Sequence, residues 1–238
     1  MLNLEKLQRN LTSRNQMSEA FITAAILAIS GGFQDAYSYI CRGNVFANAQ
    51  TGNIVLMSQH FMSGEIMKAL SYLFPILAFG IGVFIAEQIQ YKYKNSVKIH
   101  WRQGILLAEI LILFVVGFIP LKYSLLANIL VSLSCAMQVQ TFRKVGNYAY
   151  ASTMCIGNLR SGTAALSAYI RSKNPASLRQ ATYYFGIIII FAVGAGIGGI
   201  CSLKFGPKTI WCSCIILLIS FLLMFLNYLE EETQQESK

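Results

Sequence analysis

The sequence predicts an all-α protein, a polytopic bundle of six transmembrane helices with two further short segments that enter the membrane and return to the same side. Composition indicates this first: the 238-residue chain is 55% hydrophobic and only 12% charged, whereas about 25% of residues are charged in ordinary soluble domains. Six spans of about 20 residues each occupy roughly half of the chain. Residues 1–238 are therefore expected to form a single membrane domain.

The spans are located by their apolar runs. Residues 20–40 have spanning length but contain Ser30, Gln34 and Asp35, so this helix must face protein or water rather than lipid. The other five spans are apolar runs at 70–89, 104–119, 123–139, 183–203 and 210–228.

Two more polar segments, 48–62 and 151–170, decide the topology. If all eight segments cross, the basic loop after the span at 70–89 lies on the opposite side from the basic N-terminus, against the positive-inside rule. If these two segments are re-entrant, both termini are cytoplasmic, as are 14 of the 19 basic residues. The basic residues left outside are Arg42, Lys68, Lys122, Lys204 and Lys208. Six crossings are therefore favoured. With six crossings Asn95 and Asn174 both lie inside; Asn95 outside would indicate eight crossings, and Asn174 alone outside would indicate seven.

A repeated motif suggests an internal duplication. The segment GNVFANAQTGN at 43–53 resembles GNYAYASTMCIGN at 146–158, and Asp35 and Gln138 each lie eight residues before their copy. The halves are then about 18–120 and 121–228, and three crossings per half would invert the second copy, as in many transporters. The alternative is that Gly-Asn recurs by chance in a chain with 18 glycines.

The same motifs carry a family resemblance. The stretches GGFQDAY at 31–37 and VFANAQTGN at 45–53, with CAMQVQTFRK at 135–144 and MCIGNLRSG at 154–162, resemble the signature of the YoaK family of bacterial multi-pass membrane proteins. The resemblance implies a bacterial plasma-membrane protein and brings no activity or substrate. Ile156 departs from the family pattern, which commonly has Thr before Gly-Asn, so a role for that hydroxyl does not carry over.

The paired motifs are the candidate site. Helix N-termini carry partial positive charge and free N–H groups, which suit an anion or polar solute. If the two segments enter from opposite faces, a polar constriction forms near the midplane from Thr51, Gly52, Asn53, Gly157 and Asn158. The alternative is structural, with glycine allowing close helix contact and asparagine capping a helix.

Two ionisable residues complete this site. An unpaired carboxylate at the bilayer centre costs about 2.5–3.5 kcal/mol, so Asp35 is expected to face the bundle interior, with Gln138 as its neutral counterpart. Asp35 either forms an ion pair with Arg160 or takes up a proton or cation. Glu109 also lies deep in a span.

These features predict a channel or secondary transporter for a small polar or anionic solute. The rival is a structural or regulatory membrane protein. A continuous polar cavity joining Asp35, Asn53 and Asn158 would favour transport, and a fully paired core would favour structure. No metal-ligand, nucleotide or nucleophile–base motif appears, so no enzyme activity, metal or cofactor is expected. The net charge of +9 needs no nucleic-acid partner, because the positive-inside rule produces it.

Overall fold

A computed structural model describes residues 20–93, 101–145 and 148–236. Apart from a two-stranded hairpin of β1 (Lys144–Val145) and β2 (Tyr148–Ala149), which the sequence did not predict, the described elements are helical. The α-helices are α2 (Phe21–Cys41), α3 (Gln50–Met62), α4 (Ile66–Tyr93), α5 (Trp101–Val116), α6 (Ser124–Thr141), α7 (Cys155–Ser172), α8 (Pro175–Phe205) and α9 (Ile210–Glu236). Short 3-10 turns precede α6 and α9, namely η1 (Leu121–Tyr123) and η2 (Gly206–Thr209).

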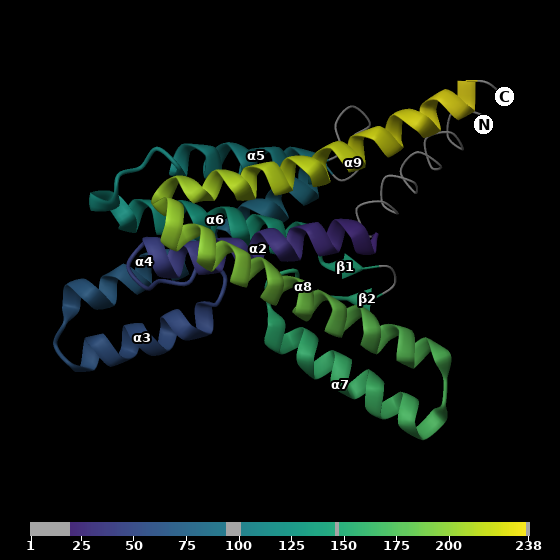
Figure 1. The fold of residues 1–238 in the computed structure, drawn as a ribbon, viewed down its shortest axis with the longest axis horizontal. Helices are drawn as coiled ribbons and strands as arrows, with labels where there is room; N and C mark the ends of the chain where they lie inside the picture. Colours follow the sequence, from purple (N-terminus) through teal and green to yellow (C-terminus); the bar gives the residue numbers. More distant parts are fainter. Residues whose placement is uncertain (1–19, 94–100, 146–147, 237–238) are drawn as a thin grey trace.

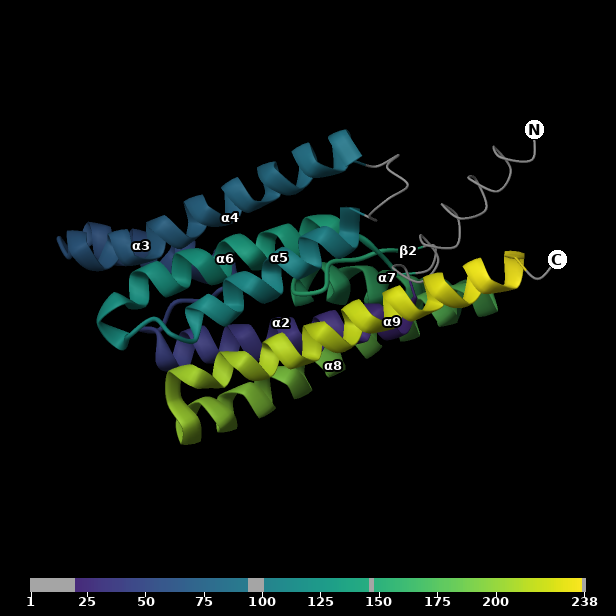
Figure 2. The same ribbon diagram turned by 90° about the horizontal axis from the view of Figure 1, so that it is seen from above.

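The long helices α2, α4, α6, α8 and α9 run roughly along one axis, and the start of α2 and the end of α9 point toward the same end of the molecule (Figures 1 and 2). Three stretches of the described chain, 66–93, 121–141 and 175–226, are long and apolar enough to cross a membrane. Helices α2 and α5, which the sequence predicts as spans, are not among these stretches: α5 has 16 residues, and α2 carries Asp35 among its buried polar groups. The predicted all-helical class is confirmed.

The helices pair across the two halves of the chain. Helix α2 lies along α8, and α4 lies along α6, an arrangement visible for α4 and α6 in Figure 2. Helix α5 packs against both α6 and α9, and α9 also packs against α2. The first helix of each half therefore packs on a long helix of the other half.

Glycines permit the closest of these contacts. A Cβ on Gly194 of α8 would collide with the backbone of Ile29 in α2, and one on Gly198 would lie 2.7 Å from the Cα of Phe33. In the other pair, a Cβ on Gly82 of α4 would collide with the carbonyl oxygen of Leu133 in α6. Small residues at such interfaces let membrane helices approach to backbone contact.

Helices α3 and α7 are each shorter than the helix that follows, with 13 residues against 28 in α4 and 18 against 31 in α8, and each folds back along that helix. Thirteen residues make α3 about 20 Å long, less than the hydrocarbon core of about 30 Å, and it packs against α4 after a turn at 63–65. Helix α7 ends at Lys173, which has a left-handed φ of 54°, and then packs against α8. Asn174 caps α8 by accepting a hydrogen bond from Ala176 N at 3.0 Å.

The short helices lie toward opposite ends of the molecule. In Figures 1 and 2 the N-terminal ends of α3 and α7 face its middle, and their C-terminal ends point away from each other. Each short helix thus forms a hairpin with the long helix that follows it.

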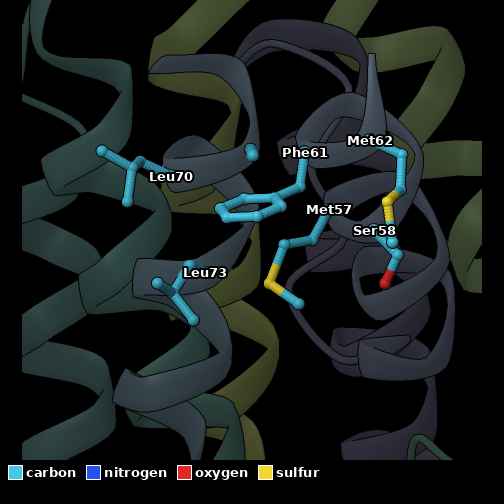
Figure 3. A pocket seen from close by; sticks show the side chains of 7 residues that line it. Met57, Ser58, Phe61, Met62, Leu70 and Leu73 are labelled. Atoms are coloured by element: carbon cyan, nitrogen blue, oxygen red, sulfur yellow. The ribbon is translucent and has the colours of Figure 1, made fainter. Parts of the chain in front are cut away.

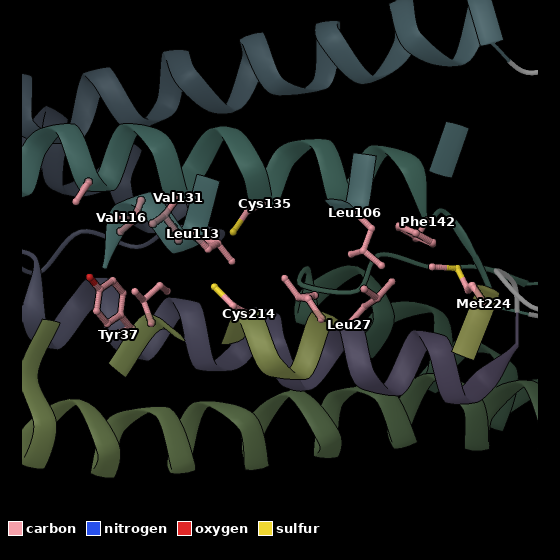
Figure 4. Close-up of a cluster of buried hydrophobic side chains, with 14 residues drawn as sticks. Leu27, Tyr37, Leu106, Leu113, Val116, Val131, Cys135, Phe142, Cys214 and Met224 are labelled. Carbon is pink, nitrogen blue, oxygen red and sulfur yellow. The ribbon is translucent and has the colours of Figure 1, made fainter. Parts of the chain in front are cut away.

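A central apolar cluster holds α2, α5, α6 and α9 together. Figure 4 shows Leu27, Leu106, Leu113 and Val131 pointing into the layer between these helices, and all four are fully buried. Large apolar side chains such as Phe84 are exposed on the outer surface instead, as expected where lipid replaces water.

We expect Gly194→Ala to lower the stability of the purified protein by about 1–3 kcal/mol, the usual range for overpacking, because the added methyl group meets the Ile29 backbone. The control is Gly196→Ala, two residues away, where a Cβ meets nothing within 4 Å. Thermal unfolding in detergent measures both variants. Equal melting temperatures for the two would contradict the proposed close packing.

Candidate functional site

Asn53 closes the loop that leads into α3. Its Oδ1 accepts from Phe46 N at 3.0 Å, and its Nδ2 donates to Phe46 O at 2.7 Å and to Gln50 Oε1 at 2.9 Å. The side chain is fully buried. One amide thus satisfies both backbone groups of a residue seven positions earlier.

Asn158 does the same before α7. Its Nδ2 donates to Ala151 O at 2.7 Å, and its Oδ1 accepts from Ala151 N at 3.4 Å, again across seven residues. Because both asparagine side chains are engaged within their own loops, the groups left to face a solute are the neighbouring helix ends rather than these two amides. This matches the structural alternative considered for the asparagines.

Asp35 fastens the loop before α3 to α2. Its Oδ1 accepts from Asn48 N at 2.7 Å, and only 7% of the residue is exposed. The ion pair with Arg160 considered from the sequence is not formed. Peptide N–H groups of the loop before α3 donate hydrogen bonds to the Asp35 carboxylate, and Arg160 lies on the exposed face of α7.

The loops before the two short helices meet at Gly31 of α2. Asn48, from the first loop, donates through Nδ2 to Gly31 O at 3.2 Å. Thr153, from the second loop, packs so closely that a Cβ on Gly31 would collide with its methyl group. The structure therefore brings the two loops together, while Asn53 and Asn158 each bond within their own loop.

The N-terminal part of α7 borders an open pocket of about 650 Å³, lined by Ile156, Gly157, Leu159, Arg160, Thr163, Ala164 and Ser167. Gly157 and Arg160 are exposed, and none of the ion pairs found between described residues involves Arg160. A guanidinium group beside a helix N-terminus attracts an anion.

The corresponding end of α3 is less polar. Thr51 is exposed, whereas a Cβ on Gly52 would lie 3.2 Å from the ring of Phe46. Further along, α3 and α4 enclose a pocket of about 320 Å³ into which Phe61, Met57 and Leu73 point (Figure 3). Ser58 supplies its one hydroxyl among apolar side chains, so the chemistry of this pocket suits a hydrocarbon chain better than a polar solute.

A buried polar cluster lies at the centre of the bundle. Gln34 Nε2 donates to Ser30 Oγ at 3.0 Å, to Ser213 Oγ at 3.1 Å and to Glu109 Oε1 at 3.2 Å. Cys135 donates through Sγ to Gln34 Oε1 at 2.7 Å. The cluster thus joins α2, α5, α6 and α9 through side chains that are all buried.

Gln138 extends this cluster toward α7. Its amide can take two orientations. In one, which suits an ionised Glu109, the nitrogen donates to Glu109 Oε1 and Oε2 at 3.0 and 3.1 Å and the oxygen accepts from Ser152 Oγ at 3.1 Å. In the other, the nitrogen donates to Ser152 Oγ at 3.1 Å. Sequence analysis placed Gln138 in the site but missed Ser213, which lies inside an apolar run. The only signal available was the four-residue spacing of Ser30 and Gln34, which puts them on one helix face.

Comparison with known proteins places this architecture in a family. A family model described as "Protein of unknown function (DUF1275)" matches residues 23–223, which reach from α2 into α9. The chain belongs to the DUF1275 family. The UPF0700 transmembrane protein YoaK of Bacillus subtilis (strain 168) is 26% identical over 205 residues, covering 81% of this chain and 88% of that protein.

No solved structure matches the chain. The resemblance to the YoaK family inferred from the motifs is confirmed. With its apolar helices and its transmembrane relative, this DUF1275 protein is a membrane protein.

We expect Asn53→Ala and Asn158→Ala each to lower stability by about 1–3 kcal/mol, because each leaves a buried backbone N–H and carbonyl unpaired. The control is Gln59→Ala, at an exposed position of α3. Thermal unfolding in detergent compares the three. A melting temperature of Asn53→Ala that equals that of Gln59→Ala would contradict a stabilising role for the hydrogen bonds between Asn53 and Phe46.

Proposed function

We propose that this protein is a channel or secondary transporter for a small polar or anionic solute in the bacterial plasma membrane. The observation that carries the proposal is the pair of short helices, α3 and α7, whose N-terminal ends face the middle of the molecule (Figures 1 and 2). Broken helices of this kind form the solute sites of many secondary transporters, with their positive ends toward anionic groups.

Arg160 favours an anion. It lines the pocket beside the start of α7 together with Gly157 and the hydroxyl-bearing residues Thr163 and Ser167. A planar guanidinium group binds carboxylate or phosphate oxygens with two parallel hydrogen bonds. The opposite pocket, between α3 and α4, has no charged residue in its lining.

The proposed topology has six crossings with both termini in the cytoplasm. The start of α2 and the end of α9 point the same way (Figure 1). The C-terminal ends of α4 and α7, which carry Lys92 and Arg171, point that way too, as does the end of α6, which Arg143 follows (Figures 1 and 2). Lys68, Lys122 and Lys204 lie at or near the other ends of their helices. Under the positive-inside rule, this distribution favours six crossings with both termini in the cytoplasm. Asn95, one of the two positions that distinguish the topologies, falls outside the described residues.

An inverted internal repeat is part of the proposal. Two features support it. The first helix of each half packs on a long helix of the other half, α2 on α8 and α6 on α4. Asn53 and Asn158 each donate to the backbone carbonyl of the residue seven positions earlier. Under this relation α3 would enter from the outer face and α7 from the inner face.

A structural or regulatory membrane protein is the second candidate. It is favoured by the hydrogen bonds that occupy Asp35, Asn53 and Asn158, because a closed polar core needs no solute. Under either proposal the protein is not an enzyme and does not bind nucleic acid.

Thiol labelling tests the topology. In a variant with the exposed Cys212 and the other reactive cysteines replaced, we expect Ser63→Cys in the turn after α3 to react with an impermeant reagent on intact cells. Asn174→Cys, in the turn after α7, should react only after the cells are opened. Protection of Ser63→Cys in intact cells would restore the eight-span alternative and remove the re-entrant α3.

Solute flux into proteoliposomes tests the activity. We expect uptake of one or more small anions, and we expect Arg160→Gln to reduce that uptake about tenfold or more, as loss of a charge-assisted contact of about 1.5–3 kcal/mol implies. The control is Lys204→Gln, which makes the same charge change at an exposed residue of α8 outside that pocket. Full activity of Arg160→Gln, or equal loss in both variants, would contradict the assignment of Arg160.

A further inference from the structure

The centre of the bundle contains a carboxyl group, that of Glu109, whose partners among the described residues are neutral. Glu109 has no exposed surface. Its carboxyl oxygens contact the amide nitrogens of Gln34 and Gln138, both neutral. Among the residues that the structure describes, no Lys, Arg or His side chain hydrogen-bonds or ion-pairs with Glu109.

The ionisable groups on the elements around Glu109 do not compensate its charge. Thiols approach it from α6 and α9, and a second carboxyl lies on α2; these are Cys135, Cys214 and Asp35. On its own helix the nearest basic residue is Arg102, seven residues or about 10 Å away along the axis. Tyr150 of the loop before α7 is within electrostatic reach of Arg102. Beyond the other end of α5, the Arg42 guanidinium donates to Val116 O.

A buried carboxylate with only neutral donors is costly in a membrane, and binding a proton removes that cost. The hydrogen bonds among the other side chains of the cluster do not need the negative charge of Glu109. Ser30 and Ser213 share a hydrogen bond of 2.6 Å, and Gln34 bonds to both. With the Gln138 amide in its other orientation, its oxygen faces Glu109 and can accept from the protonated carboxyl group, while its nitrogen donates to Ser152 Oγ at 3.1 Å. A protonated carboxyl group can therefore reside here with a partner for its O–H.

Gln138 connects this carboxyl group to the candidate solute site. It contacts Glu109 through its amide nitrogen and Ser152 through its amide oxygen. Ser152 belongs to the loop that leads into α7, the helix that carries Arg160. When Glu109 gains or loses its proton, the Gln138 amide faces a different hydrogen-bonding group. Its hydrogen bond to Ser152, and with it the contact with the loop before α7, therefore changes.

We propose that Glu109 is a proton-binding site at the centre of the bundle and that Gln138 links its protonation to the position of α7. The proton binds to a carboxylate oxygen of Glu109, and no other bond changes. The link to α7 rests on the proposed transport function, and it makes the protein a proton-coupled transporter of an anion. The proton site itself does not depend on transport.

Infrared spectroscopy tests the proton site independently of any solute. The full chain, reconstituted in lipid with carboxyl-labelled glutamate, should show a labelled carboxylic-acid C=O band at neutral pH that disappears at alkaline pH. Asp35 is the only aspartate, so the label separates it from Glu109. We expect the band to be absent in Glu109→Gln and present in Asp35→Asn.

Two outcomes would overturn the proton site. One is a spectrum without a protonated glutamate at any pH at which the protein remains folded. The other is loss of the band when sodium chloride replaces choline chloride at constant pH, which would make the ligand a metal cation. Because the native chain carries the label, these outcomes do not depend on whether a variant folds.

Proton flux tests the coupling. In proteoliposomes with an internal pH dye, uptake of a small anion by the native chain should acidify the interior and should vary about tenfold with pH, a usual size for linked sites. Gln138→Met should flatten that pH profile while retaining the infrared band. Gln140→Met is the matched control, since Gln140 bonds to Glu87 outside the cluster.

The outcomes separate the two proposals. Absence of anion uptake by the native chain would refute the transport function and leave the infrared result to decide the proton site. Uptake without proton movement, or with an unchanged pH profile in Gln138→Met, would overturn the coupling and leave transport standing.

Discussion

The constraint on which this fold depends is that backbone groups inside a membrane must find partners within the protein. The chain leaves helical geometry in its interior twice, before α3 and before α7, and each time a side-chain amide supplies the missing bonds: Asn53 to Phe46 and Asn158 to Ala151. Arg42 extends the same principle to α5, where its guanidinium donates to Val116 O and Pro120 O. These bonds place the ends of α3 and α7 near the middle of the bundle.

Much of the helix layout was predictable from the sequence because hydrophobic runs set helix positions directly. The predicted spans at 70–89 and 210–228 lie within α4 and α9. In the polar segment 48–62 the structure has a helix, α3, of only 13 residues, which agrees with the small number of apolar residues there. The re-entrant topology of the two polar segments stays a prediction. The helix ends were less accurate, because charged side chains such as Lys92 extend helices beyond the apolar run.

The site was only partly predictable, because its chemistry depends on contacts between distant residues. Nothing local indicated that Asn53 would turn back onto its own loop rather than toward a solute. Glu109 and Gln34 are 75 residues apart, so their contact follows from how the helices pair. The sequence places Arg160 within a polar segment, but its partner could not be chosen without knowing which face of α7 is exposed.

The two kinds of helix contact differ in what they allow to move. The pairs α2–α8 and α4–α6 meet at Gly194 and Gly82 with backbone against backbone. Such close packing does not allow the two helices of a pair to slide along each other. Gln34 of α2 is instead joined to Cys135 of α6, and to Glu109 of α5 and Ser213 of α9, by side-chain hydrogen bonds, so a movement of one pair against the other must change the partners of Gln34. Under the proposed transport function, alternating access is therefore expected to keep the glycine contacts intact and to rearrange the polar cluster. Glu109, which lies in that cluster, is positioned for a change in its charge to bias such a movement.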